Sequence, residues 1–183
     1  INLAHLGTRI EAALGDGARW GARIRYSREP EALETAGGIA LALPLLGDDP
    51  FLVVNGDIWT DFDFGRFRTA ALQMTHQRLL AWCVLVENPV HHRRGDFGLR
   101  AGMLTNDDPA RLTFSGIALY RRELFASVVP GTRTALAPLL RAACAGGRVG
   151  GELHAGRWVD VGTPQRLAEL DGMIGAGAAN ARR

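Results

Sequence analysis

The sequence predicts one α/β domain with a mixed, mostly parallel central sheet that helices cover in a three-layer arrangement. Its 183 residues are 47% hydrophobic, which suits a single domain with a sizeable core. Two continuous apolar runs of strand length, at 51–54 and 79–86, are typical of strands buried on both faces. Segments with helical periodicity alternate with these runs, as is typical of α/β folds.

The individual elements follow from apolar periodicity and from capping signals. Helices are expected at residues 8–14, 39–46, 64–72, 135–145 and 165–170. Strands are expected at residues 23–26, 51–54, 79–86 and 112–120, with a strand end at 1–3 and a short strand that delivers Asp160. Thr35 can cap the second helix, and Thr163 followed by Pro164 is an N-cap and N1 signature for the last one. The last residues are expected to be frayed.

Composition and charge exclude several classes of partner. A formal charge of +2 without a dense basic block does not indicate a nucleic-acid surface, although a small anionic ligand remains compatible. No run of about 18 apolar residues and no signal peptide is present, which predicts a cytoplasmic protein without a membrane partner. Cys83 and Cys144 form no metal-ligand pattern and are expected to be buried, reduced thiols. All 21 basic residues are arginine, so any step that needs a lysine must use arginine or another segment.

Two aspartates are the candidate metal ligands. Asp57 follows the apolar run 51–54 through Asn55 and Gly56, and Asp160 follows a short strand in a second glycine-containing turn. If the two carboxylates converge, they match Mg²⁺, which takes oxygen ligands and keeps water and substrate phosphates as the remainder. The alternative is that Asn55, Gly56 and Asp57 form only a tight turn.

Residues 29–38 (EPEALETAGG) are a candidate nucleotide loop. Gly37 and Gly38 expose backbone N–H groups near the positive end of the following helix, which suits a nucleotide's polar edge or a phosphate. The alternative is a plain helix cap with glycines for close packing. A second polar loop, residues 87–97, follows the apolar run 79–86; its His91 and His92 are expected to be solvated rather than metal ligands. Ser115 and Gly116 interrupt the strand at 112–120, as at a bulge or a ligand contact.

Three of these segments, taken in order, resemble the motifs of the sugar-1-phosphate nucleotidyltransferases. Residues 29–38 resemble the E-x-x-x-L-G-T-A-G loop that holds the base and ribose. Residues 54–57 (VNGD) resemble the metal-aspartate motif, and residues 158–163 (WVDVGT) resemble the W-x-D-x-G-T motif that carries the second metal aspartate. Residues 95–97 and 114–117 stand where the family's sugar-contacting loop and strand lie. The resemblance covers nearly the whole chain and implies a Rossmann-like nucleotidyltransferase fold.

The resemblance implies an enzyme that uses Mg²⁺ to transfer a nucleotidyl group from UTP to a sugar 1-phosphate, with Asp57 and Asp160 as the catalytic metal ligands. The implied nucleotide-binding residues are Glu34, Thr35, Ala36, Gly37, Gly38, Asn55 and Gly56. The implied sugar-binding residues are Asn55, Gly95, Asp96, Ser115 and Gly116. The G-D-F and Glu-Thr variants, with His-His before them, most resemble the branch that acts on N-acetylmuramate 1-phosphate in peptidoglycan recycling. A monomer or weak homodimer is expected.

The sequence also departs from the family pattern. Glu34 replaces the usual glycine before Thr35, and the family's E-K-P motif is absent. The family's glycine-rich G-x-G-x-R loop and a lysine after it would precede Ile1, so residues 1–183 are expected to be one nucleotidyltransferase domain that is incomplete at its N-terminus. A polypeptide that began at Ile1 would be expected to lack the main triphosphate site and to be inactive; we expect instead that those residues exist in the protein.

Three alternatives remain open. The first is a guanylyl- or thymidylyltransferase that acts on another hexose 1-phosphate, and the second is a non-catalytic nucleotide-sugar-binding module. The third is an unrelated α/β domain whose aspartates only form turns. Turnover of UTP against GTP tests the first alternative, and binding of a UDP-sugar without pyrophosphate release would support the second.

Overall fold

The computed structural model describes residues 1–48 and 50–180, and side chains as far as Gly175. The helices are α1 (Gly7–Leu14), α2 (Glu34–Ala42), α3 (Phe67–His76), α4 (Leu136–Ala145) and α5 (Pro164–Asn180). The strands are β1 (Asn2–Leu3), β2 (Ser27–Arg28), β3 (Phe51–Val54), β4 (Ile58–Thr60), β5 (Ala81–Val86), β6 (Gly98–Arg100), β7 (Met103–Thr105), β8 (Thr113–Tyr120), β9 (Val149–Leu153) and β10 (Trp158–Asp160). None of the helices within this described part is long and apolar enough to cross a membrane.

The central sheet is mixed, but it is not mostly parallel. Its strand order is β3-β8-β5-β9-β7-β6, and of the described pairs only β5 with β9 is parallel. The expectation of a mostly parallel sheet was therefore wrong. Strand β5 is buried on both faces, and such burial does not depend on the direction of the neighbouring strand. The expectation that the run 51–54 is also buried on both faces was wrong, because β3 is an edge strand whose Leu52 and Val54 are exposed.

Strands β3 and β5 nevertheless end at the same edge of the sheet. Both are antiparallel to β8, which lies between them, so they run in the same direction. In the two registers, Phe51 and Ala81 both pair with Tyr120 at their amino ends. The polar loops that follow Val54 and Val86 therefore leave the sheet on one side, as expected for a common site.

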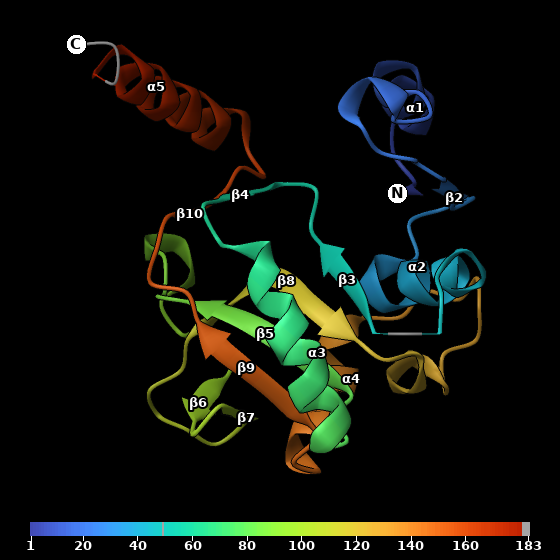
Figure 1. The fold of residues 1–183 in the computed structure, drawn as a ribbon, viewed down its shortest axis with the longest axis vertical. Coiled ribbons are helices and arrows are strands. Elements are labelled where there is room, and N and C mark those ends of the chain that lie inside the picture. The colour runs from blue at the N-terminus through green and yellow to red at the C-terminus, as the bar shows by residue number, and fades with distance from the viewer. Residues whose placement is uncertain (49, 181–183) are drawn as a thin grey trace.

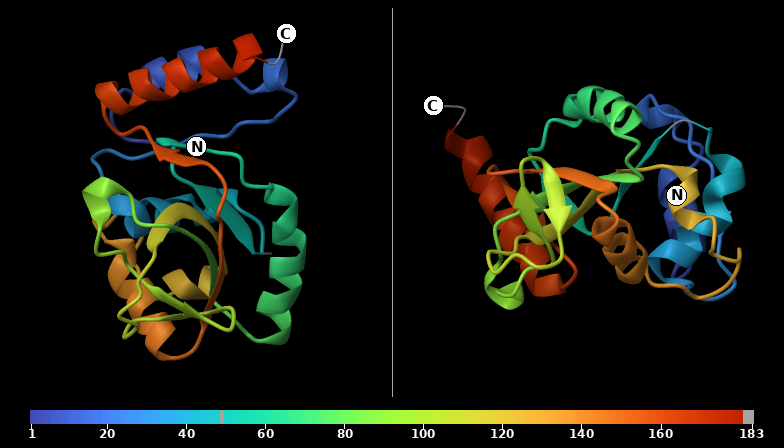
Figure 2. Two further views of the ribbon diagram at one scale, coloured as in Figure 1. Left: turned by 90° about the vertical axis from the view of Figure 1, so that its left-hand side faces the viewer. Right: turned by 90° about the horizontal axis from the view of Figure 1, so that it is seen from below.

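Helices cover both faces of the sheet, which confirms the three-layer arrangement (Figure 1). Figure 2 shows α3 on one side of the sheet and α2 and α4 on the other. Alternate residues of β5 serve the two layers, because successive side chains of a strand point to opposite faces. Cys83 belongs to the larger core with α2 and α4, whereas Trp82 and Val84 belong to the smaller core with α3.

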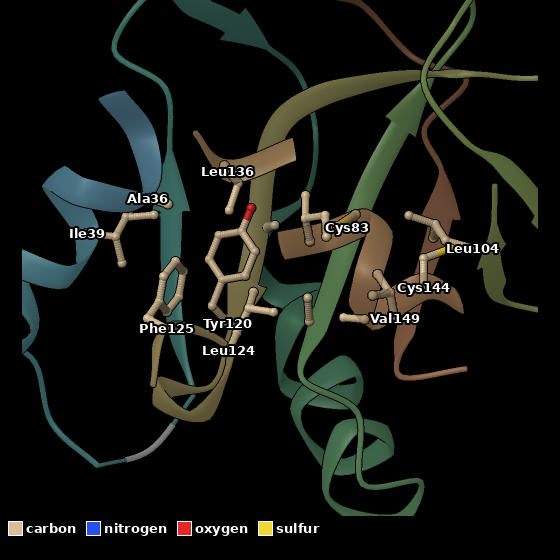
Figure 3. Packing of buried hydrophobic residues seen from close by; sticks show 14 of the residues in the cluster. Ala36, Ile39, Cys83, Leu104, Tyr120, Leu124, Phe125, Leu136, Cys144 and Val149 are labelled. Carbon is tan, nitrogen blue, oxygen red and sulfur yellow. The ribbon is translucent and has the colours of Figure 1, made fainter. Parts of the chain in front are cut away.

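The larger core is closed by aromatic and aliphatic side chains from four parts of the chain. Figure 3 shows Tyr120 of β8 beside Phe125, with Ile39 of α2 and Leu136 of α4 around them. The rings of Tyr120 and Phe125 meet edge to face with centroids 5.6 Å apart. Both cysteines are free and buried, as expected. This core fixes the amino end of α2 against the sheet, where the candidate nucleotide loop, residues 29–38, passes into the helix.

Two small sheets lie outside the central one. Strands β1 and β2 pair in parallel near the N-terminus, and β4 and β10 pair in antiparallel as a short ribbon. The ribbon brings together the two segments that carry Asp57 and Asp160, although they lie about a hundred residues apart in the sequence.

Several element boundaries differ from the expected ones. The strand expected at 23–26 is β2 at Ser27–Arg28, and the helix expected at 64–72 is a 3-10 turn followed by α3. Helix α2 begins at Glu34 with Leu33 as its N-cap, so Thr35 lies inside the first turn and does not cap it. Helix α5 extends to Asn180, and residues 181–183, the end of the segment expected to be frayed, lie outside the described part.

Strands β4, β6, β7 and β9 were not expected, and β9 shows why. Gly150 and Gly151 give this strand little apolar signal. A Cβ at Gly150 would lie 2.6 Å from the Trp82 ring, and one at Gly151 would lie 2.4 Å from the carbonyl oxygen of Cys83. The glycines therefore allow β9 to approach β5 closely. An argument from strand propensity treats glycine as a strand breaker, so it does not predict β9.

Candidate active site

Asp57 and Asp160 lie side by side at the end of the β4–β10 ribbon. Asp160 pairs with Ile58, the residue after Asp57, and the backbone N–H of Val161 donates to the carbonyl oxygen of Asp57 at 2.8 Å. A Cβ at Gly162 would lie 2.9 Å from Oδ1 of Asp160 and 3.3 Å from Oδ2 of Asp57, so both carboxylates border the same small space. The structure thus brings together the two carboxylates that the sequence singled out.

The two carboxylates fit a divalent cation as a partial ligand set. Within residues 1–48 and 50–180, no cluster of three or more His, Cys, Asp or Glu side chains is arranged to hold a metal. Asp57 and Asp160 supply oxygen ligands only, which is the chemistry that Mg²⁺ prefers when substrate phosphates and water complete its shell. The donor set is therefore compatible with Mg²⁺ bound together with a substrate, rather than in a site formed by the protein alone.

Two basic side chains, those of Arg166 and His91, accompany Asp160, and the sequence interpretation anticipated neither contact. Nη2 of Arg166 lies 3.3 Å from Oδ1 of Asp160, and Nε2 of His91 lies 3.6 Å from Oδ2. Nη1 of Arg166 also lies 3.3 Å from Nε2 of His91. His91 is exposed, as expected for a solvated loop residue, but its contact with Asp160 was not expected. No local pattern could reveal this contact, because it depends on how the loop 87–97 and the start of α5 dock against the ribbon.

The ribbon is anchored by hydrogen bonds behind the carboxylates. Oδ1 of Asp61 accepts from the backbone N–H of Arg157 at 2.8 Å and lies 3.0 Å from Nε2 of His154. Desolvation raises the pKa of Asp61, but the hydrogen bonds from Arg157 and His154 outweigh it and hold the pKa below its usual value. The indole N–H of Trp158 donates to the carbonyl oxygen of Ser115, which ties the ribbon to β8. These contacts fix the orientation of both aspartates relative to the sheet.

The start of α2 is already hydrogen-bonded within the protein. The backbone N–H groups of Ala36 and Gly37 both donate to the carbonyl oxygen of Thr134 at 3.1 Å. A Cβ at Gly37 would lie 2.3 Å from the carbonyl oxygen of Thr132, so this glycine serves close packing. Gly38 likewise leaves room for Glu29. Of the expected nucleotide-binding residues on this helix, Glu34, Thr35 and Gly38 border a cavity.

Glu34 has a backbone conformation that favours glycine. Its φ is 60°, in the left-handed region, and its carboxylate accepts from Nε of Arg133 at 2.9 Å. This is the position at which the motif has glycine, and the left-handed conformation costs a residue with a Cβ about 1–2 kcal/mol. The ion pair with Arg133 is exposed and offsets little of that cost.

We expect Glu34→Gly to stabilise the protein relative to Glu34→Ala by about 1 kcal/mol, because both variants lose the ion pair but only glycine relieves the left-handed strain. Chemical denaturation of the two variants measures the difference in the free energy of unfolding. Equal stabilities would show that the backbone at this position carries no strain.

Asn55, Gly95 and Gly116 are three of the residues expected to bind the sugar. Gly116 has a φ of 77°, and a Cβ there would lie 2.6 Å from Nδ2 of Asn55, so the missing side chain makes room for the amide. The backbone N–H of Asn55 donates to the carbonyl oxygen of Gly116 at 2.9 Å. Gly95, with a φ of 60°, packs its Cα face against the backbone of Arg111.

Asp96 and Ser115 are both engaged within the protein. Asp96 accepts from the backbone N–H of Phe114 at 2.8 Å through Oδ2, and its Oδ1 lies 3.1 Å from Nε2 of His92. His92 was expected to be solvated and is half-buried against this carboxylate instead. Ser115 is fully buried, and its hydroxyl donates to the carbonyl oxygen of Val84 at 2.8 Å. The Ser115 hydroxyl therefore supports the strand and does not face a cavity.

Two cavities meet at three shared residues, Glu34, Thr35 and Asn55. The smaller, of about 400 Å³, lies between the loop 87–97 and α4 and is also bordered by Asp96 and Phe114. The larger, of about 920 Å³, lies between β1, α2 and the exposed edge of β3. Asp57 and Asp160 border neither cavity, but Asp57 directly follows Asn55, which borders both cavities, and Gly56, which borders the larger one. Volumes of this order suit small-molecule ligands.

Comparison with known proteins identifies relatives. The family model described as "Nucleotidyl transferase" matches residues 1–99. The N-acetylmuramate alpha-1-phosphate uridylyltransferase of Neisseria meningitidis is 49% identical over 181 residues, which are 96% of this chain and 78% of that protein. An enzyme of the same description from Caulobacter vibrioides is 34% identical over 154 residues, 76% of this chain. The aligned part is 63% of that relative, less than two thirds of its length.

A solved structure supports the fold. A Bacillus anthracis protein in complex with a sucrose, described as a candidate glucose-1-phosphate thymidylyltransferase, superposes with a TM-score of 0.77 at 19% identity. The match covers 94% of this chain and 74% of that one. At this identity the likeness concerns the fold, and it confirms the expected α/β class.

Proposed function

This chain belongs to the nucleotidyl transferase family, and we propose from this premise that it transfers a uridylyl group from UTP to N-acetylmuramate 1-phosphate, giving UDP-N-acetylmuramate and pyrophosphate. The observation that carries the proposal is the likeness to the Neisseria relative, which extends over nearly the whole chain. The convergence of Asp57 and Asp160 beside two ligand-sized cavities supports it. We further propose a role in peptidoglycan recycling in the cytoplasm; the free, buried thiols suit that compartment.

The proposed reaction needs positioning more than a covalent nucleophile. An oxygen of the sugar 1-phosphate attacks the α-phosphorus of UTP in line with the departing pyrophosphate. The attacking phosphate is already ionised at neutral pH, so no protein group has to remove a proton from it. The Ser115 hydroxyl is not placed to act as a nucleophile, since it is buried and donates to Val84.

Asp57 and Asp160 would hold Mg²⁺ in this scheme. When bound, Mg²⁺ neutralises charge on phosphate oxygens and so favours attack by one anion on another. Arg166 and His91 lie beside Asp160. Arg166 would place a positive charge next to the reacting phosphates.

The two cavities divide the substrates between them in this proposal. The larger cavity, which is bordered by Thr35, Gly38 and Gly56, would take the nucleotide. The smaller cavity, which is bordered by Asp96, would take the sugar. Asn55 borders both cavities and precedes Asp57 closely in sequence, so it would lie where the two substrates meet.

The test is Mg²⁺-dependent pyrophosphate release from the complete protein with UTP and N-acetylmuramate 1-phosphate. GTP with mannose 1-phosphate and dTTP with glucose 1-phosphate serve as competing pairs in parallel reactions. We expect the UTP pair to have the highest kcat/KM. A higher value for another pair would reassign the substrate, and tight binding of UDP-N-acetylmuramate without pyrophosphate release would indicate a binding module.

A further inference from the structure

The smaller cavity is lined by one positive charge that no acidic side chain pairs with in the described residues, and a neutral sugar would not need such a charge. Its two acidic lining residues already have partners: Glu34 with Arg133, and Asp96 with His92 and the N–H of Phe114. Of the residues that line this cavity, Arg141 is the basic one.

Arg141 is exposed, and an aromatic ring orients its guanidinium without the use of the N–H groups. It projects from α4, and its Cζ lies 5.3 Å from the centroid of the buried Phe97 ring. Such a contact orients the guanidinium plane through the aromatic face. The backbone carbonyl oxygen of Arg141 accepts from Nδ2 of Asn106 at 2.9 Å, which fixes this turn of the helix. Over the described residues, the Arg141 side chain has no hydrogen-bond or ion-pair partner, so its donors remain open for a ligand.

A guanidinium with open donors at the wall of a cavity is suited to a carboxylate, which it can bind through two parallel hydrogen bonds. N-acetylmuramate differs from N-acetylglucosamine by a lactyl ether on O3, and this ether ends in a carboxylate. We propose that Arg141 binds the lactyl carboxylate and is the residue that selects N-acetylmuramate 1-phosphate over N-acetylglucosamine 1-phosphate. This inference rests on the proposed function and names the part of that substrate that the cavity recognises.

The experiment measures kcat and KM of the complete protein for the two sugar phosphates with UTP, in the wild type and in Arg141→Gln. The expected result is a fall of about tenfold in the preference for N-acetylmuramate 1-phosphate, because one charge-assisted contact is lost for this substrate alone. The change should lie mainly in KM, since the carboxylate is remote from the reacting phosphorus and is bound equally in the ground and transition states. Arg141→Lys should retain part of the preference.

Arg68→Gln is the matched control, because Arg68 is an exposed arginine on α3, across the sheet from α4. It should leave both substrates unaffected. An equal loss for both substrates in Arg141→Gln, or an unchanged preference, would overturn the assignment of Arg141 while leaving the proposed function intact. A wild-type protein that turns over neither sugar phosphate would overturn the proposed function and this inference with it.

Discussion

Removal of either paired carboxylate charge, by Asp57→Asn or Asp160→Asn, is expected to lower kcat for pyrophosphate release by about a thousandfold or more. Two anionic substrates must meet in the reaction, and a bound cation contributes several kcal/mol of charge stabilisation, with each tenfold in rate worth about 1.4 kcal/mol. Asparagine keeps the size of the side chain and one oxygen but supplies no negative charge. The two substitutions should give similar losses, because both carboxylates border the space at Gly162.

Binding of Mn²⁺ in the presence of UTP, measured by calorimetry, provides a second readout that is independent of turnover. Both variants should bind the metal more weakly than the wild type. Asp171→Asn is the control, since this exposed carboxylate lies further along α5, away from the ribbon. Full activity in Asp160→Asn with an intact fold would mean that Asp160 serves only to pair with Arg166 and His91.

The sequence was sufficient to predict those parts of the fold that burial determines. Strands β5 and β8 are apolar because both faces of the sheet are covered there, and this leaves a continuous pattern in the chain. Strand β3 has the same pattern but is an edge strand whose Leu52 and Val54 are exposed, so its existence was predicted and its burial was not. The direction of β8 leaves no such pattern, because its residues are buried whether its neighbours run parallel or antiparallel. Strand β9 was missed because its place in the sheet depends on the absence of side chains at Gly150 and Gly151, and this absence leaves no apolar pattern either.

The residues of the candidate site also differ in whether the sequence could reveal them. Asp57 and Asp160 could be found because each follows a strand in a glycine-containing turn, and the β4–β10 ribbon then aligns them. His91 and Arg166 could not be found, because their contacts with Asp160 arise only when separate segments dock. Ser115 is the opposite case, because the sequence pattern was present but the side chain is used within the fold. Its position in a motif indicated a ligand contact, whereas its burial in β8 commits the hydroxyl to Val84.

Substitution of Gly116 is expected to have the second large effect, because a side chain at this position has two separate costs, backbone strain and steric crowding. Its φ of 77° disfavours any side chain, and a Cβ there would lie 2.5 Å from Cδ1 of Ile58 and 2.6 Å from Nδ2 of Asn55. Gly102, in the turn between β6 and β7, has the same φ of 77° but no heavy atom within 4 Å of a Cβ. The two glycines therefore separate the backbone cost from the cost of crowding.

Gly102→Ala is expected to lower the free energy of unfolding by about 1 kcal/mol, from the left-handed backbone alone. Gly116→Ala should lower it by about 2–4 kcal/mol, since forced crowding adds a further 1–3 kcal/mol, roughly. Denaturant titration measures both values. Gly116→Ala should also reduce kcat/KM, because the new methyl group displaces the Asn55 amide that borders both cavities, whereas Gly102→Ala should leave turnover unchanged. Equal losses of stability in the two variants would show that Ile58 and Asn55 move aside freely, and the amide would then not be held by Gly116.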